Sequence, residues 1–164
     1  RDSVLAVSGK LSPSMYGPGF DSFAFIDDHS PHYLYDRQDV DDPRTWRRSV
    51  YRFIVRSVPD PFMEVLDCPD PSMNVPVRNQ TITALQALSL LNNKFMVRHA
   101  EFFAERVARM GNSAADRVSA ALRLALGREP AESEVELLSA HTEQHGLAST
   151  CRVILNMHDF VLVD

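Results

Sequence analysis

Features that would restrict the function of this 164-residue chain are scarce. Its 17 basic residues are outnumbered by 22 acidic ones, which gives a net charge of −5. Without a basic surplus, the electrostatic attraction that dominates nucleic-acid affinity is weak, so we do not expect nucleic acid as a partner. No apolar run approaches the roughly 18–20 residues needed to span a bilayer, and the N-terminal residues lack the apolar stretch of a signal peptide.

Cysteine is also rare, since Cys68 and Cys151 are the only two. Two cysteines do not make a disulfide framework, and no CxxCH haem-attachment motif occurs, so we expect no cofactor in this stretch of chain. Cys151 falls on the apolar side of an expected helix, as a small core residue does. An oxidising compartment would allow the two thiols to pair, and the sequence leaves that alternative open.

Motifs with a fixed catalytic geometry are absent. There is no Gly-rich phosphate loop, nucleophile elbow or kinase signature, which favours a non-catalytic function. The composition, 45% hydrophobic and 24% charged, suits one domain over residues 1–164 with a core of its own. The chain opens on Arg1, and residues 2–8 resemble the end of a helix closed by Gly9. We therefore expect the C-terminal part of a larger multidomain protein.

The first third of the chain predicts little regular structure. Residues 10–42 are rich in turn formers, yet they carry too many aromatic residues for a disordered linker. Residues 49–57 fit two periodicities. Phe53 and Ile54 continue a helical spacing from Trp46, whereas Tyr51, Phe53 and Val55 alternate with arginines as in a strand. The strand alternative, with 62–66 returning beside it, predicts a small β ribbon between Val50 and Leu66.

The remaining two thirds predict about five helices, so the fold class is mainly α. Thr83 and Gln86 have the spacing of a capping box at the start of ALQALSLL. Residues 95–110 place an apolar stripe opposite charged residues, and the stripe consists of Met96, Ala100, Phe103, Val107 and Met110. Three further helices are expected from 113 to Gly127, from Pro130 to near Gly146, and from 147 to 156.

One group of polar residues brackets the proline-rich stretch before the capped helix: Glu64, Asp67, Asp70, Arg78 and Asn79. Two carboxylates and an arginine could act as acid, base and electrostatic clamp. Arginine–carboxylate pairs more often hold loops in place, and we favour that structural interpretation. The group is accordingly a candidate binding site, and no residue is assigned a catalytic role.

Two patterns resemble metal sites without completing one. His141 and His145 are one helical turn apart, which places two imidazoles within reach of one ion, but no third or fourth ligand is evident. The acidic residues of the irregular segment lack the spacing of a calcium loop. We therefore expect a half-buried helix edge at the histidines, a solvated acidic loop, and no metal site. The acidic residues are Asp27, Asp28, Asp36, Asp39, Asp41 and Asp42.

An ordered set of segments links the chain to a known family. The middle third runs through RRSVYRFIVRS, VLDCPDP and TITALQALSLLNN, and the C-terminal part contains LALGREPAESEVELL and CRVILNMHDFVLVD. In this order the segments resemble domain of unknown function 1553, an extracytoplasmic C-terminal domain of large planctomycete proteins that often carry a c-type cytochrome module. One departure is Cys68, where the family more often has alanine.

The resemblance implies a non-catalytic accessory or interaction domain of a secreted multidomain protein. It further implies a periplasmic or extracellular location, upstream domains of the same chain as partners, and haem c supplied by one of those domains. The alternative is an enzyme or a carbohydrate-binding domain that acts on polysaccharide, with its site near the Asp67–Asn79 loop.

Overall fold

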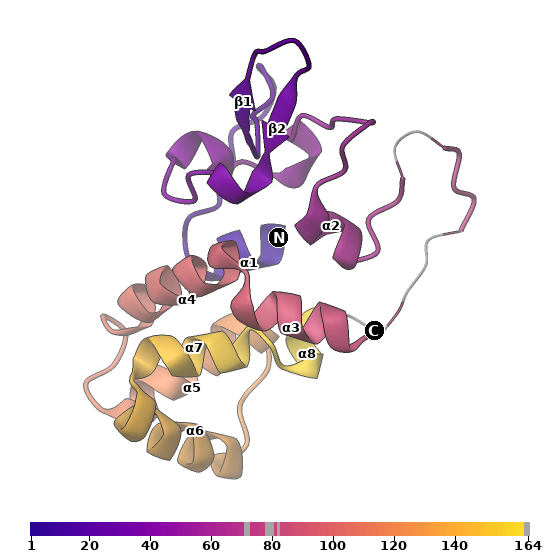
Figure 1. The fold of residues 1–164 in the computed structure, drawn as a ribbon. Helices are drawn as coiled ribbons and strands as arrows, with labels where there is room; N and C mark the ends of the chain where they lie inside the picture. Colours follow the sequence, from indigo (N-terminus) through magenta and orange to yellow (C-terminus); the bar gives the residue numbers. More distant parts are fainter. Residues whose placement is uncertain (71–72, 78–80, 82, 163–164) are drawn as a thin grey trace. The chain divides into compact units, whose positions relative to one another are not determined.

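The computed structural model describes residues 1–70, 73–77, 81 and 83–162. Within these residues the chain is mainly α, with five longer helices and a small two-stranded antiparallel sheet, as the sequence predicts (Figure 1). The chain forms two compact units. One, here called the helical unit, contains Arg1, residues 3–10 and the chain from Leu90 onward, and the other, here called the hairpin unit, contains Asp2 and Leu11–Ser89.

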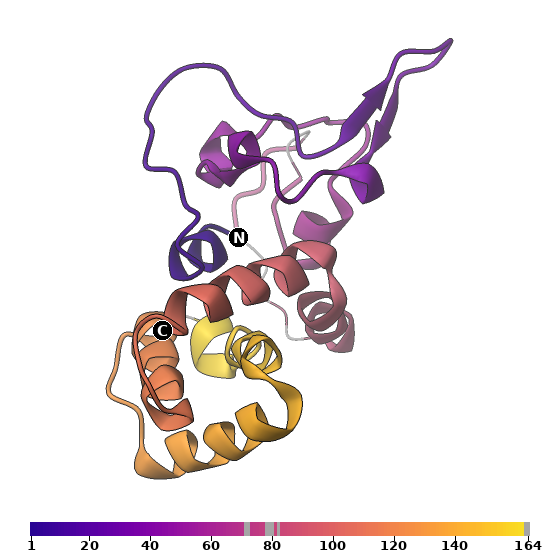
Figure 2. The same ribbon diagram turned by 90° about the vertical axis from the view of Figure 1, so that its left-hand side faces the viewer.

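The helical unit is built from one short N-terminal helix and the helices of the C-terminal half. Helix α4 packs on α7 and α5, α5 packs on α6, α7 and α8, and α6 packs on α7 (Figure 2). The elements are α1 (Asp2–Val7), α4 (Lys94–Val107), α5 (Ala114–Leu126), α6 (Glu132–His145), α7 (Leu147–Ile154) and α8 (His158–Val161).

Local side-chain chemistry sets where these helices begin and end. The Asn93 side chain accepts a hydrogen bond from the backbone N–H of Phe95 and caps α4. Ser113 and Asp116 form the predicted capping box of α5. That helix ends at Gly127 in the left-handed conformation, with φ of 68°, where glycine carries no Cβ penalty. These caps are readable from sequence because every partner lies within one turn.

The predicted apolar stripe of α4 is the centre of the core. Met96, Ala100, Phe103 and Val107 are all buried, and Phe103 is fully so. Helix α4 ends at Val107, however, and Met110, which the stripe included, is 52% exposed. The other buried apolar residues of the helical unit include Leu5, Val118, Leu122, Cys151, Ile154 and Leu155.

Helix α1 is held against α4 by polar contacts. The Arg106 guanidinium donates to the backbone carbonyls of Ala6 and Val7 at 2.9 and 2.7 Å, at the end of α1, where carbonyls have no partner within the helix. The buried His99 ring lies next to Phe95, and its Nδ1 is 3.0 Å from the Ser8 hydroxyl. These contacts attach the C-terminal end of α1 to α4 of the helical unit.

The hairpin unit contains the sheet and several single turns of 3-10 helix. Strand β1 pairs antiparallel with β2, and Phe25 lies opposite Tyr33. Cross-strand and neighbouring aromatic rings pack on this hairpin, with the Phe23 and Tyr33 centroids 5.1 Å apart. The elements are β1 (Ala24–Ile26), β2 (His32–Leu34), η1 (Tyr35–Arg37), η2 (Pro43–Trp46), η3 (Ser49–Tyr51), α2 (Pro61–Val65) and the first residues of α3 (Ala84–Asn92).

The position predicted for the β ribbon is wrong. The sheet lies in the segment that we expected to be irregular, and residues 50–66 form η3, isolated backbone contacts and α2 instead. The reason lies in which side chains are buried. Phe53 is 53% exposed, whereas the Arg52 side chain is only 7% exposed because it pairs with Asp60. The alternation that suggested an apolar strand face therefore fails at Arg52 and Phe53, although Val55 is buried.

Candidate functional site

The candidate site begins with the local sequence Asp60-Pro61. Asp60 is the N-cap of α2, and its carboxylate accepts from the backbone N–H groups of Phe62 and Met63. Pro61 occupies the first helical position, where its missing N–H is not needed. This pair stabilises a helix of five residues that would otherwise be too short to persist.

The same carboxylate pairs with a largely buried arginine. Arg52 Nη1 lies 3.1 Å from Asp60 Oδ2, with the two side chains 7% and 12% exposed. The Ser22 hydroxyl donates to the same oxygen at 3.4 Å. With two backbone N–H groups, an arginine and a hydroxyl around it, the Asp60 carboxylate is fully occupied by structural contacts. Breaking such a buried pair leaves an uncompensated charge, so both residues are strongly constrained.

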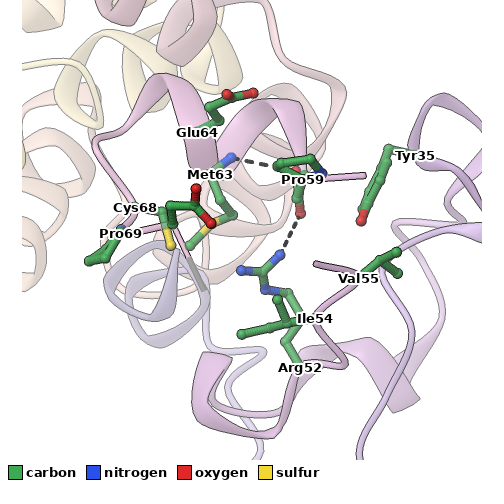
Figure 3. A pocket seen from close by; sticks show the side chains of 11 residues that line it. Tyr35, Arg52, Ile54, Val55, Pro59, Met63, Glu64, Cys68 and Pro69 are labelled. Carbon is green, nitrogen blue, oxygen red and sulfur yellow. Dashed lines mark hydrogen bonds and ion pairs between the residues drawn. The ribbon is translucent and has the colours of Figure 1, made fainter. Parts of the chain in front are cut away.

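Around this ion pair lies a pocket of about 110 Å³. Figure 3 shows the side chains of Tyr35, Arg52, Met63 and Cys68 turned toward it. The Tyr35 hydroxyl donates to the carbonyl of Val58 at 2.8 Å. Burial, followed by the negative charge of Asp60, raises the pKa of Tyr35 above its usual value, so the phenol stays protonated. The lining also includes Glu64, Pro69 and Asp70.

The structure divides the predicted binding residues. Glu64 and Asp70 line the pocket. Asp67 does not, because its carboxylate accepts hydrogen bonds from the backbone N–H and hydroxyl of Thr81 and from the side chain of Gln86, at 2.7, 2.8 and 3.0 Å. Arg78 and Asn79 lie outside the described residues, and so does the role predicted for Arg78 in holding this turn.

Asp67 supports the start of α3. The predicted capping box is present, with Thr83 N–H donating to Gln86 Oε1 at 2.9 Å and Gln86 N–H donating to Thr83 Oγ1 at 3.1 Å. Asp67 has a left-handed backbone conformation with φ of 58°, which aspartate tolerates better than most residues. The carboxylate is thus held at a turn that positions the helix.

A second, more polar pocket of about 390 Å³ lies elsewhere in the hairpin unit. Asp39 and Asp42 of the acidic segment line it, together with Arg37 and Arg44. The Arg44 guanidinium, 2.7 Å from the Asp42 carboxylate, lowers the pKa of Asp42. Within the described residues no three His, Cys, Asp or Glu side chains are grouped so as to hold a metal ion.

The remaining candidates from the sequence are two histidines and the two cysteines. His141 and His145 do come together on α6, with ring centroids 4.7 Å apart. Both cysteines are free thiols. Cys68 lines the smaller pocket, whereas Cys151 is buried in the helical core, where desolvation raises the pKa of its thiol to about 12. Cys151 is therefore a core residue and not a nucleophile.

Comparison with known proteins identifies a family. The family PSD1, a protein of unknown function (DUF1553), matches residues 1–142. The chain belongs to this family. The resemblance read from the ordered segments is confirmed, and the DUF1553 match covers the hairpin unit and the helical unit as far as α6. No curated protein and no solved structure matches the chain. In the part that the structure describes, every helix is too short or too polar to cross a membrane.

Sequence reasoning missed the residues at the centre of the smaller pocket. Asp60-Pro61 carries the aspartate–proline cap signature that also begins η2 at Asp42-Pro43, so Asp60 was detectable as a helix start. Arg52 was not, because the periodicity placed it on a solvent face. Its partner is eight residues away across irregular backbone, and no spacing rule predicts that pair.

Proposed function

We propose that this DUF1553 chain is a non-catalytic interaction domain whose hairpin unit docks on another protein domain. The observation that carries the proposal is the balance of buried and exposed apolar side chains in that unit. Among its described apolar residues only Phe20 and Val55 are buried. The exposed large ones are Met15, Tyr16, Phe25, Ile26, Val50, Phe53, Ile54, Val58, Met73, Val75, Val77, Leu85 and Leu88.

Helix α3 concentrates this apolar surface on one element. None of its described residues is buried, and Leu85 and Leu88 lie three positions apart on one side of the helix with exposed fractions of 61% and 57%. Singly scattered apolar residues are normal on a protein surface, but a contiguous apolar face marks an interaction site. A nine-residue helix is also marginal in water without tertiary packing, so a docked partner would stabilise α3.

The polar groups of the unit support a non-catalytic role. The Asp60 carboxylate is engaged by a helix cap and Arg52, and the Asp67 carboxylate by Thr81 and Gln86. Catalytic acids and bases need a proton-transfer partner within reach of a substrate. The alternative of an enzyme or carbohydrate-binding domain has less support, since the pocket lined by Glu64 and Asp70 measures about 110 Å³. Ligand sites usually measure about 300–1,000 Å³.

Other domains of the same polypeptide are the partners that we propose. This part of the proposal rests on the family resemblance, as do the periplasmic or extracellular location and a neighbouring c-type cytochrome domain. Protein domains within one chain bury surfaces of moderate size, which suits an apolar helix face of this length.

Hydrogen–deuterium exchange tests the docking by comparing residues 1–164 alone with the same residues inside the full native polypeptide. We expect slower exchange at 84–91 and 50–58 in the full polypeptide. A paired variant, Leu85→Glu with Leu88→Glu, should abolish this protection, while Leu137→Glu, a 71% exposed leucine on α6, should leave it intact. Equal exchange in the two contexts would refute the proposal. Line broadening at Glu64 and Asp70 by soluble oligosaccharides would favour the carbohydrate alternative.

A further inference from the structure

A different site lies at the C-terminal end of α6. His141 and His145 are one turn apart, and their imidazole rings meet with centroids 4.7 Å apart and planes inclined by 46°. His141 is half-buried and His145 is exposed, so the pair is open to solvent on one side. The surrounding hydrogen bonds determine which nitrogen of His141 carries its proton.

Two threonines fix that proton. The Thr142 hydroxyl lies 2.7 Å from the backbone carbonyl of Leu138, which can only accept, so Thr142 is the donor there. Thr142 Oγ1 is also 2.9 Å from Thr150 Oγ1. Because a hydroxyl has a single proton and that of Thr142 is already used, Thr150 must donate in this second contact.

The same reasoning assigns the proton between Thr150 and His141. His141 Nδ1 lies 2.9 Å from Thr150 Oγ1. If the single proton of Thr150 serves either Thr142 Oγ1 or the carbonyl of Gly146, 3.3 Å away, none is left for the histidine, so we assign the donor role to His141 Nδ1. In the neutral ring, a proton on Nδ1 leaves the lone pair on Nε2. A hydrogen bond from the other ring nitrogen is the usual device that orients a metal-binding histidine.

The distance between the rings matches shared coordination. Two imidazoles that bind one ion at about 2.0–2.1 Å, with about 90–110° between the bonds, have ring centroids about 4.5–5.2 Å apart. The observed separation of 4.7 Å lies within this interval. Imidazole nitrogen is a ligand preferred by zinc and copper, whereas calcium and magnesium prefer oxygen.

We propose that His141 and His145 bind one divalent transition-metal ion, through Nε2 of His141 and a ring nitrogen of His145, with Thr150 as the positioning residue. Water completes the coordination, since no third His, Cys, Asp or Glu is grouped with the pair among the described residues. The site is independent of the docking surface proposed above, because it lies in the helical unit and uses none of the apolar residues of the hairpin unit.

Nitrogen-15 NMR of the full 1–164 chain tests the proton assignment without metal. We expect the neutral His141 ring to carry its proton on Nδ1, and Thr150→Val to remove this preference. Titration with Zn²⁺ alone should then perturb His141 Nε2 and one nitrogen of His145. A proton on Nε2 of His141 in the metal-free chain would overturn the assignment.

Affinity measurements on variants test the site itself. His141→Ala and His145→Ala should each weaken Zn²⁺ binding by at least about tenfold, and Thr150→Val, which removes only the orienting hydroxyl, by about 10–100-fold. His158→Ala, on the neighbouring short helix α8, is the matched control and should change the affinity less than twofold. Thermal denaturation of each variant verifies that the helical unit is folded. An unchanged affinity in folded His145→Ala would overturn the proposal.

Discussion

Phe103 shows, at the scale of one residue, how burial of a side chain on the apolar stripe of α4 stabilises the fold. Its ring is fully buried at the centre of α4, so Phe103→Ala removes the transfer free energy of the ring and leaves a cavity. We expect a loss of about 3–5 kcal/mol in the free energy of unfolding. Urea denaturation measures it, with Glu101→Ala as the control. Glu101 forms only a partly exposed pair with Arg98, so that variant should lose less than about 1 kcal/mol. Equal midpoints would show that the burial of α4 is misassigned.

The reactivity of each of the two thiols shows whether that thiol is buried. Desolvation raises the pKa of Cys151 from 9.0 to about 12, which means that the folded state holds the thiol proton more tightly than the unfolded state. The stability that this contributes is complete below pH 9 and is lost as the pH rises from 9 toward 12. At neutral pH an aromatic disulfide reagent should titrate Cys68 in the native chain and Cys151 only after unfolding. Rapid titration of both thiols in the native chain would contradict the buried position of Cys151.

Asp67 is the corresponding test at the scale of an element, because its carboxylate holds the segment before α3. Asp67→Ala removes the acceptor for Thr81 and Gln86 and places alanine at φ of 58°. We expect a loss of about 0.5–2 kcal/mol, the range for a missing helix cap, with faster amide exchange at 84–87.

Two further substitutions separate the carboxylate from the backbone. Asp67→Gly lacks the carboxylate but accepts the left-handed conformation, so its loss should be smaller than that of alanine. Asp67→Asn keeps an acceptor oxygen and tolerates the conformation, so it should be the mildest of the three. If all three variants melted like the native chain, the turn at Asp67 would not support α3.

Elements whose determinants are local were predictable from the sequence. The caps at Thr83, Ser113 and Gly127 involve partners within one turn, so residue type and spacing identify them. The hairpin depends on pairing between Phe25 and Tyr33 across a turn, and no alternation long enough to reveal it occurs in three-residue strands. Residues 50–66 misled for a related reason, since the long-range ion pair with Asp60 buries Arg52 while Phe53 is exposed.

At the scale of the whole chain, the family and the helical class were readable because many weak local signals agree in order. The candidate site was only partly predictable from the sequence. Glu64 and Asp70 do share a pocket, but Arg52 and Tyr35 reach it from distant parts of the sequence. The threonine contacts that fix the His141 proton likewise join α6 to α7, and a helical spacing cannot show them. Long-range partners decide what a side chain can do, and a single sequence does not give them.

The unequal cores of the two units predict unequal stability. The helical unit buries Phe103, Val107, Leu122 and Leu155, whereas the hairpin unit buries only Phe20 and Val55 among its described apolar residues. In native-state hydrogen exchange we expect the slowest amides in α4, α5 and α7. Amides of the hairpin unit should exchange at least about tenfold faster after correction for intrinsic rates, equivalent to about 1.4 kcal/mol.

Two core substitutions distinguish separate opening from joint opening. Val55→Ala should accelerate exchange in the hairpin unit and leave α4 unchanged, because each unit opens with its own core. Leu122→Ala, with the side chain fully buried in α5, should accelerate exchange throughout the helical unit. If Val55→Ala instead accelerated α4 as much as the hairpin unit, the chain would open as one cooperative body.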